Sequence, residues 1–145
     1  MKKLSAAGAF SLIEVTLAIG IAAFCLIAVF GLVPVAVQTN RNATSQTAAT
    51  NIIAALIADM RATTSSTSPQ YVITFGTAKT LYFDGTGQFT TSLGANSRYR
   101  IRITFPSSPS GLSYANVKAT WPAPVDPATT TPSGLVETFA AFDRN

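Results

Sequence analysis

One stretch of sequence decides the fold of this chain: residues 10–37, FSLIEVTLAIGIAAFCLIAVFGLVPVAV. Its 28 residues include a single charged side chain, Glu14. A helix of about 20 apolar residues crosses the hydrocarbon core of a bilayer, so this stretch is long enough to span one. Lys2 and Lys3 precede it, and Arg41 is the first basic residue after it. This short basic flank predicts a cytoplasmic N-terminus and an exported C-terminal part.

Two simpler kinds of N-terminal signal fit this stretch less well. A secretory signal peptide has an apolar region of about 7–15 residues that ends at a small-x-small site, and here the apolar run continues well beyond that. A lipoprotein signal needs a small residue before its cysteine, but Phe24 precedes Cys25. A plain signal anchor stays open, although it leaves Glu14 unexplained, because a carboxylate within a membrane span costs roughly 3 kcal/mol at the centre.

The residues around Glu14 carry a more specific pattern. The string GAFSLIEV, residues 8–15, resembles the type IV prepilin signature. In that family a prepilin peptidase cuts after a small residue, the new N-terminus is usually an N-methylated Phe, and Glu is the fifth mature residue. The resemblance implies cleavage between Ala9 and Phe10, with methylation of Phe10. The family usually has Gly where this chain has Ala9, but a cut after Gly8 would place Glu14 out of register.

The resemblance also implies an assembly role for Phe10 and Glu14. Cleavage frees an ammonium group at Phe10, and the Glu14 carboxylate of a neighbouring subunit can neutralise it. Each charge is costly alone among packed helices and tolerable as a pair. The pair would therefore fix the axial offset of a newly added subunit. The alternative is a Glu side chain near a helix end that reaches the membrane interface.

The remainder of the stretch is typical of a helix that packs against other helices, because small residues such as Gly20 let backbones approach closely. Gly31 and Pro34 predict either a kink or locally melted stretch, or the boundary of the membrane span. Residues 38–62 continue the helix, and their apolar side chains recur at three- and four-residue spacing. This stripe is predicted to lie on a sheet. Its members are Ala48, Ala49, Ile52, Ile53, Leu56 and Met60.

The rest of the chain predicts strands. A Ser/Thr-rich loop ends the helix at residues 63–69, and Asp84-Gly85-Thr86-Gly87 predicts a hairpin turn. Residues 99–105 alternate apolar side chains with arginines, which is typical of a half-buried strand, whereas both faces of the last strand are apolar. The candidate strands are Tyr71–Phe75, Thr80–Phe83, Gln88–Thr91, Tyr99–Phe105, Asn116–Trp121 and about Leu135–Phe142.

These elements predict an α+β fold: a long N-terminal transmembrane and amphipathic helix packed on a C-terminal antiparallel β-sheet of four to five strands. This layout resembles the pilin architecture. The final strands around Trp121-Pro122 resemble small minor pseudopilins of the PilV or GspI type, and residues 30–35 resemble the Verru_Chthon cassette protein B family. The predicted parts are a leader at 1–9, a hydrophobic helix at 10–37, its amphipathic continuation at 38–62 and a globular sheet domain at 63–145.

Composition argues against several other functions. The chain has no histidine and six acidic residues, so no converging set of catalytic groups is apparent and no enzyme or cofactor is predicted. Its single cysteine excludes an intrachain disulfide. Asp84 alone supplies a carboxylate in its turn, too few ligands for calcium, and no metal site is predicted. Arg98, Arg100 and Arg102 are expected on one face of a strand, but Tyr99 points to the other face, which disfavours nucleic-acid stacking.

The predicted function is structural. The chain is expected to be a minor pilin or pseudopilin of a type IV pilus or type II secretion-like filament. Its expected partners are other pilin subunits, the prepilin peptidase, the inner membrane and an assembly platform, with the sheet domain in the periplasm before filament assembly. Two alternatives stay open. The sheet domain is a binding module at a filament tip for DNA or an adhesion target, or the chain is a membrane-anchored protein that is never processed.

Overall fold

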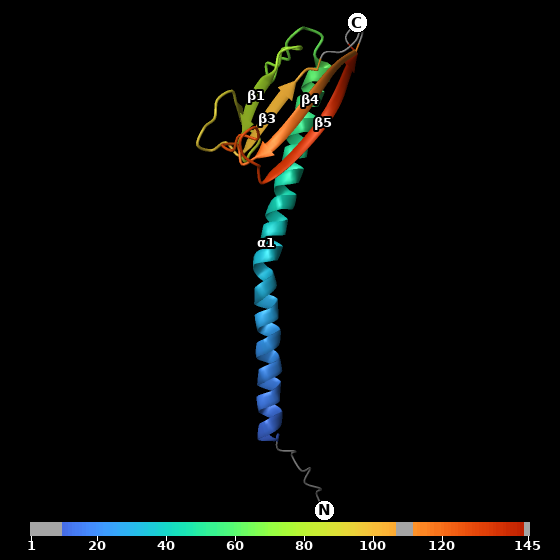
Figure 1. Cartoon of the computed structure of the whole chain (residues 1–145). Helices are drawn as coiled ribbons and strands as arrows, with labels where there is room; N and C mark the ends of the chain where they lie inside the picture. The colour runs from blue at the N-terminus through green and yellow to red at the C-terminus, as the bar shows by residue number, and fades with distance from the viewer. Residues whose placement is uncertain (1–9, 107–111, 144–145) are drawn as a thin grey trace, which may run out of the picture. The chain divides into compact units, whose positions relative to one another are not determined.

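The computed structural model of the chain describes residues 10–106 and 112–143. By its internal contacts the chain divides into two units, Met1–Arg41 and Asn42–Asn145, which are described separately. In the described residues one helix precedes five strands (Figure 1). Their bounds are α1 (Leu12–Ala62), β1 (Lys79–Phe83), β2 (Phe89–Thr90), β3 (Tyr99–Thr104), β4 (Leu112–Trp121) and β5 (Gly134–Asp143). The predicted long apolar helix and antiparallel sheet are therefore confirmed as an α+β layout.

The five strands form a single sheet in the order β2-β1-β3-β4-β5, and every neighbouring pair is antiparallel. The longest ladder joins β4 to β5 and runs without interruption from the Leu112–Asp143 pair to the Trp121–Gly134 pair. The predicted hairpin turn connects β1 to β2. Alternation fixes the register of β3: Tyr99, Ile101 and Ile103 are buried, and the residues between them are not.

The core of the second unit lies between the C-terminal part of α1 and one face of this sheet, called the inner face below. The predicted apolar stripe of the helix is buried there, and Leu56 is 0% exposed. Full burial of such a side chain stabilises the fold by about 1.5–3 kcal/mol. Across from the stripe lie apolar side chains from β1, β3, β4 and β5. The sheet residues are Leu81, Phe83, Tyr99, Ile101, Ile103, Ala115, Val117, Ala119, Ala140 and Phe142.

The prediction of a strand at Tyr71–Phe75 is wrong. This segment forms turns and contributes only an isolated bridge, between Thr67 and Thr74. Val72 adopts a positive φ of 52°, a conformation that no strand contains. Tyr71 and Ile73 are buried in the core all the same, whereas Val72 is exposed. The β-forming residue types of this segment therefore reflect burial of its side chains rather than pairing in the sheet.

Side chains supplement the few backbone hydrogen bonds that this segment makes with residues 66–68. The carboxylate of Asp59 on α1 accepts hydrogen bonds from the backbone N–H groups of Gln70 (3.4 Å) and Tyr71 (3.2 Å). The Ser68 hydroxyl accepts one from the N–H of Ile73 (3.1 Å). Asp59 and Ser68 are themselves buried, so these bonds satisfy polar groups that water does not reach.

Two open questions about the chain are answered by the fold. The helix α1 continues through Gly31 and Pro34, so a locally melted stretch is wrong, whereas a kink and a membrane boundary stay predictions. A proline removes one backbone hydrogen bond, and helical bonds on either side hold the turn. The last strand β5 turns Ala140 and Phe142 toward the core, whereas Leu135 and Phe139 are exposed on the opposite face.

Candidate functional site

The N-terminal unit begins with the residues that the sequence singles out. Phe10 lies just before α1 and is 80% exposed. The carbonyl oxygen of Ser11 accepts hydrogen bonds from the N–H groups of Glu14 (3.0 Å) and Val15 (3.2 Å), which start the helix. Glu14 therefore lies in the first turn, where the partial positive charge of the helix end favours a carboxylate. Ala9 and the predicted cleavage bond lie outside the described residues.

The apolar surface of this unit is uncovered along its whole described length. Every residue from 10 to 41 is exposed, including Phe24 (74%) and Phe30 (68%). By length and composition this part of α1 can cross a membrane. Soluble monomers rarely expose contiguous apolar patches beyond a few hundred Å². A surface of this extent is typical of membrane or protein interaction sites.

The glycines of this unit have no packing reason inside the chain. A Cβ atom added at Gly20 or Gly31 would meet no other atom within 4 Å. Glycine within a helix costs about 0.5–1 kcal/mol relative to alanine, so its presence at two positions is a local disadvantage. Close approach by another helix is a use for these positions that lies outside the chain.

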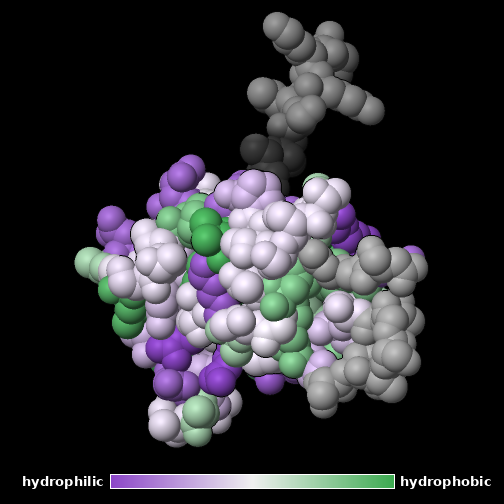
Figure 2. Space-filling model, turned by 90° about the horizontal axis from the view of Figure 1, so that it is seen from above, coloured by the Kyte–Doolittle hydropathy of each residue, from purple (hydrophilic) through white to green (hydrophobic). Residues whose placement is uncertain are grey.

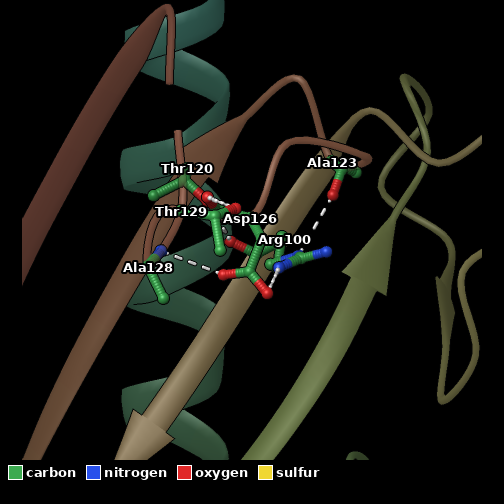
Figure 3. Close-up of polar contacts among 6 residues, drawn as sticks. All are labelled: Arg100, Thr120, Ala123, Asp126, Ala128 and Thr129. Atoms are coloured by element: carbon green, nitrogen blue, oxygen red, sulfur yellow. Dashed lines mark hydrogen bonds and ion pairs between the residues drawn. The ribbon is translucent and has the colours of Figure 1, made fainter. Parts of the chain in front are cut away.

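A second polar arrangement lies on the outer face of the sheet, the face away from α1. Arg100 on β3 forms an ion pair with Asp126 (3.2 Å) and donates a hydrogen bond to the carbonyl oxygen of Ala123 (3.1 Å), both in the β4–β5 loop (Figure 3). Asp126 in turn accepts a hydrogen bond from the N–H of Ala128 (3.0 Å). The pKa of the Asp126 carboxyl is lowered, mainly by the hydrogen bond from Ala128 and further by Arg100. Arg100 thereby ties the loop to the sheet.

The neighbouring row of the outer face runs across four strands. Thr80, Arg102, Lys118 and Glu137 are register partners on β1, β3, β4 and β5. Lys118 forms an ion pair with Glu137 (3.3 Å), and Glu137 also accepts a hydrogen bond from the Asn116 amide (2.7 Å). That hydrogen bond, followed by Lys118, lowers the pKa of Glu137.

The expectation that Arg98 shares a face with Arg100 and Arg102 is wrong. Arg98 precedes β3, and its guanidinium donates a hydrogen bond to the hydroxyl of Ser45 on α1 (3.1 Å), on the inner side. Strand alternation does not extend to a residue outside the strand. The structure thus brings Arg100, Arg102 and Lys118 together and leaves Arg98 apart.

The Asp84 turn uses its carboxylate within the chain. One oxygen of Asp84 accepts hydrogen bonds from the hydroxyl (2.7 Å) and N–H (2.8 Å) of Thr86 and from the N–H of Gln88 (3.0 Å). The hydroxyl bond is the largest cause of a lowered pKa at Asp84. Among the described residues no three Cys, His, Asp or Glu side chains lie together in a way that could hold a metal ion.

Comparison with known proteins gave no match. This holds for protein-family models, for curated proteins and for solved structures. Function must therefore be argued from the sites themselves, that is, from their geometry and chemistry.

Sequence reasoning missed the partners that organise the outer face. Asp126 lies in a Pro/Thr-rich loop, 26 positions after Arg100, and nothing in the spacing links the two. The pairing of Lys118 with Glu137 follows only once β4 and β5 are placed side by side in register. An acidic residue in a loop, or a lysine and a glutamate on two different strands, is too general a signal to have found either pair.

Proposed function

We propose that this chain is a pilin-like structural subunit that is held in a membrane by the N-terminal part of α1 and joins a filament through the same helix. The observation that carries the proposal is the uncovered apolar surface over residues 12–37, with Glu14 as its one charge. The exposed Phe10 next to the helix start supports it further. Minor pilin and pseudopilin are the subunit types that the prepilin-like signature favours.

Glu14 is the residue whose position needs a partner. In the described residues its carboxylate forms no ion pair, and Ile13, Val15, Leu17 and Ala18 around it on the helix are apolar. Placed among packed helices, an uncompensated carboxylate is strongly unfavourable. The α-ammonium group that cleavage would create at Phe10 of a neighbouring subunit is a cation of the right size at the matching depth. We assign Glu14 the role of fixing the register of each added subunit.

The glycines fit the same role. Gly20 and Gly31 leave room on the surface of α1 that nothing in the chain occupies. Lipid tails are as apolar as the helix side chains, so helices in a membrane associate through close packing rather than through the hydrophobic effect. Small residues at such positions allow that close packing. A helix that only anchored the protein would gain stability from alanine at both sites.

A site-specific crosslinking experiment tests the proposal in cells that contain a prepilin peptidase and assembly platform. Glu14→Gln removes the charge and keeps the side-chain shape, whereas Glu14→Asp keeps the charge. Incorporation into filaments, measured by crosslinks between subunits along residues 12–37, should fall about tenfold or more in Glu14→Gln, because a charge-assisted contact is lost.

Thr16→Val is the matched control, since Thr16 lies on the same exposed helix and its hydroxyl bonds only to the carbonyl of Ile13 (2.9 Å). It should assemble like the wild type, and Glu14→Asp should retain part of the assembly. Equal incorporation of Glu14→Gln and wild type would contradict the register role. An absence of any crosslinks between wild-type subunits would contradict the filament itself.

A further inference from the structure

We propose that a groove on the outer face of the sheet, built around Arg102 and Lys118, binds a carboxylate side chain of an acidic peptide segment from a partner protein. The inference concerns a face of the second unit that the filament proposal does not use. It rests on charge, register and the shape of the surface between the sheet and the β4–β5 loop.

The groove consists of two adjoining hollows, of about 200 and 270 Å³. Arg102, Lys118 and Pro127 line both of them. The sheet forms the floor, and residues of the β4–β5 loop form one wall, which the Arg100–Asp126 ion pair holds in place. Viewed from above, the surface of the sheet-bearing unit is a mixture of hydrophilic side chains and small hydrophobic areas (Figure 2). Charged and polar side chains line both hollows, and Pro127 and Ala128 of the loop supply apolar lining.

The cations in this groove are arranged against the usual rules of sheet pairing. Arg102 and Lys118 are direct register partners on β3 and β4, and like charges placed opposite one another destabilise a sheet. Arg100 is ion-paired with Asp126, and Lys118 is ion-paired with Glu137. Arg102 has no ion-pair or hydrogen-bond partner in the part of the chain described. Arg102 also interacts electrostatically with Asp126, but that carboxylate is already ion-paired with Arg100. A local rule that is broken with so little compensation in the described residues points to a functional surface.

The charge balance selects the class of ligand. Three cations, Arg100, Arg102 and Lys118, face two carboxylates, Asp126 and Glu137, so the groove carries one uncompensated positive charge. One carboxylate matches that charge, and the planar guanidinium of Arg102 can hold it through two parallel hydrogen bonds. A polyanion such as nucleic acid would bring further charges against Asp126 and Glu137.

The wall of the groove favours a peptide as the carrier of that carboxylate. Pro127 and Ala128 offer apolar contacts to the aliphatic stem of an acidic side chain. The aromatic ring near the groove, Tyr82, is already covered by the guanidinium of Arg100, 5.7 Å from the ring centre. That face of the ring is therefore closed to a sugar acid that would stack on it.

The test is an NMR titration of the full-length, isotope-labelled chain in detergent micelles. The probes are acetyl-Ala-Glu-Ala-amide and its neutral analogue acetyl-Ala-Gln-Ala-amide. The Glu peptide should shift the backbone resonances of Arg102, Thr104 and Lys118 in a saturable way that weakens with added salt. The Gln peptide should leave them unchanged.

Variants separate binding from folding. Arg102→Gln should weaken binding of the Glu peptide about tenfold or more, because a charged hydrogen-bond donor is lost. Its melting temperature should not fall, since the substitution relieves the repulsion from Lys118. Arg102→Lys should retain part of the affinity. Arg61→Gln, at an exposed arginine on α1 outside the groove, is the control and should bind like the wild type.

Four results would overturn the proposal. Equal shifts with the Gln peptide would show that the carboxylate is not recognised, and unchanged binding by Arg102→Gln would show that the site is elsewhere. Saturation by galacturonate or by a single-stranded oligonucleotide at lower concentration than the Glu peptide would assign the groove to another ligand. No shift with any probe would show that this is a solvated face.

Discussion

The contact between Trp121 and Gly134 gives the sharpest test of the sheet. The two residues are register partners at the end of the β4–β5 ladder, and the Trp121 ring lies over the glycine. A Cβ atom added at Gly134 would lie 2.1 Å from Cζ2 and 2.2 Å from Cε2 of Trp121. Real side chains do not approach this closely, so Gly134→Ala must displace the indole ring or separate the two strands.

The expected cost follows from two opposing effects. Overpacking of this kind costs about 1–3 kcal/mol, and Trp121 cannot move freely because it packs edge-on against the buried Tyr99, with ring centres 6.1 Å apart. Alanine restricts the unfolded chain more than glycine does, which returns about 0.4–1 kcal/mol. Gly134→Ala should therefore lower the free energy of unfolding by about 1–2 kcal/mol. In a domain of this size, each kcal/mol lost lowers the melting temperature by roughly 4–8 °C.

Trp121 is also the reporter, because the chain contains one tryptophan. Thermal unfolding in detergent, followed by tryptophan fluorescence and circular dichroism, gives the stability, and the emission of the folded state reports the moved ring. Gly85→Ala is the control: its Cβ would lie 4.0 Å from the nearest atom, in Arg98, an ordinary contact. In a Trp121→Leu background the penalty of Gly134→Ala should largely disappear. An unchanged melting temperature with unchanged emission would refute the described contact.

Three further predictions concern the second unit. Leu56→Ala should lower the free energy of unfolding by about 2–5 kcal/mol in chemical denaturation, because Leu56 is fully buried, whereas Leu93→Ala, 46% exposed, should change it by less than about 1 kcal/mol; equal losses would contradict the assigned core. Asp59→Ala should cost about 2–4 kcal/mol, because two backbone N–H groups lose their acceptor. It should also lower the pKa of the Tyr71 phenol, which burial and then the Asp59 charge raise, and an unchanged tyrosine absorbance titration would count against this contact. Asp126 and Glu137 have lowered pKa values, so the stability they provide is present above the ordinary carboxyl pKa of about 4 and is lost as pH falls through the lowered values. The amide resonance of Ala128 should therefore keep its position from neutral pH to about pH 4 and move below it, and movement between pH 7 and 5 would contradict the pairing.

Sequence periodicity predicted the elements whose side-chain pattern is set by burial on one face. Residues 99–105 alternate because one face of β3 meets the core, and the stripe around Leu56 repeats because one side of α1 does. In both elements, the spacing of apolar residues in the local sequence indicates which side chains are buried in the fold.

The segment Tyr71–Phe75 shows where this reasoning fails. Its residue types favour a strand, but the N–H groups of Tyr71 and Ile73 bond to the side chains of Asp59 and Ser68. Partners that lie elsewhere in the sequence decide the backbone conformation there, and no local pattern records them. The same holds for Asp126, whose role depends on how the β4–β5 loop folds back onto Arg100.

The roles of Phe10 and Glu14 are predictions of a different kind. The structure shows Glu14 in the first turn of an exposed helix and Phe10 just before it, but the partner that the account requires is on another copy of the chain. No property of one chain can supply it, and this is why the processed N-terminus is the decisive feature.

Intact-mass and N-terminal peptide mass spectrometry of the protein, isolated from membranes of cells with a prepilin peptidase, tests the central claim most directly. The account predicts a chain that lacks residues 1–9 and begins with a Phe10 that carries one added methyl group. A chain that still begins at Met1, or one cut at any bond other than Ala9–Phe10, would contradict it.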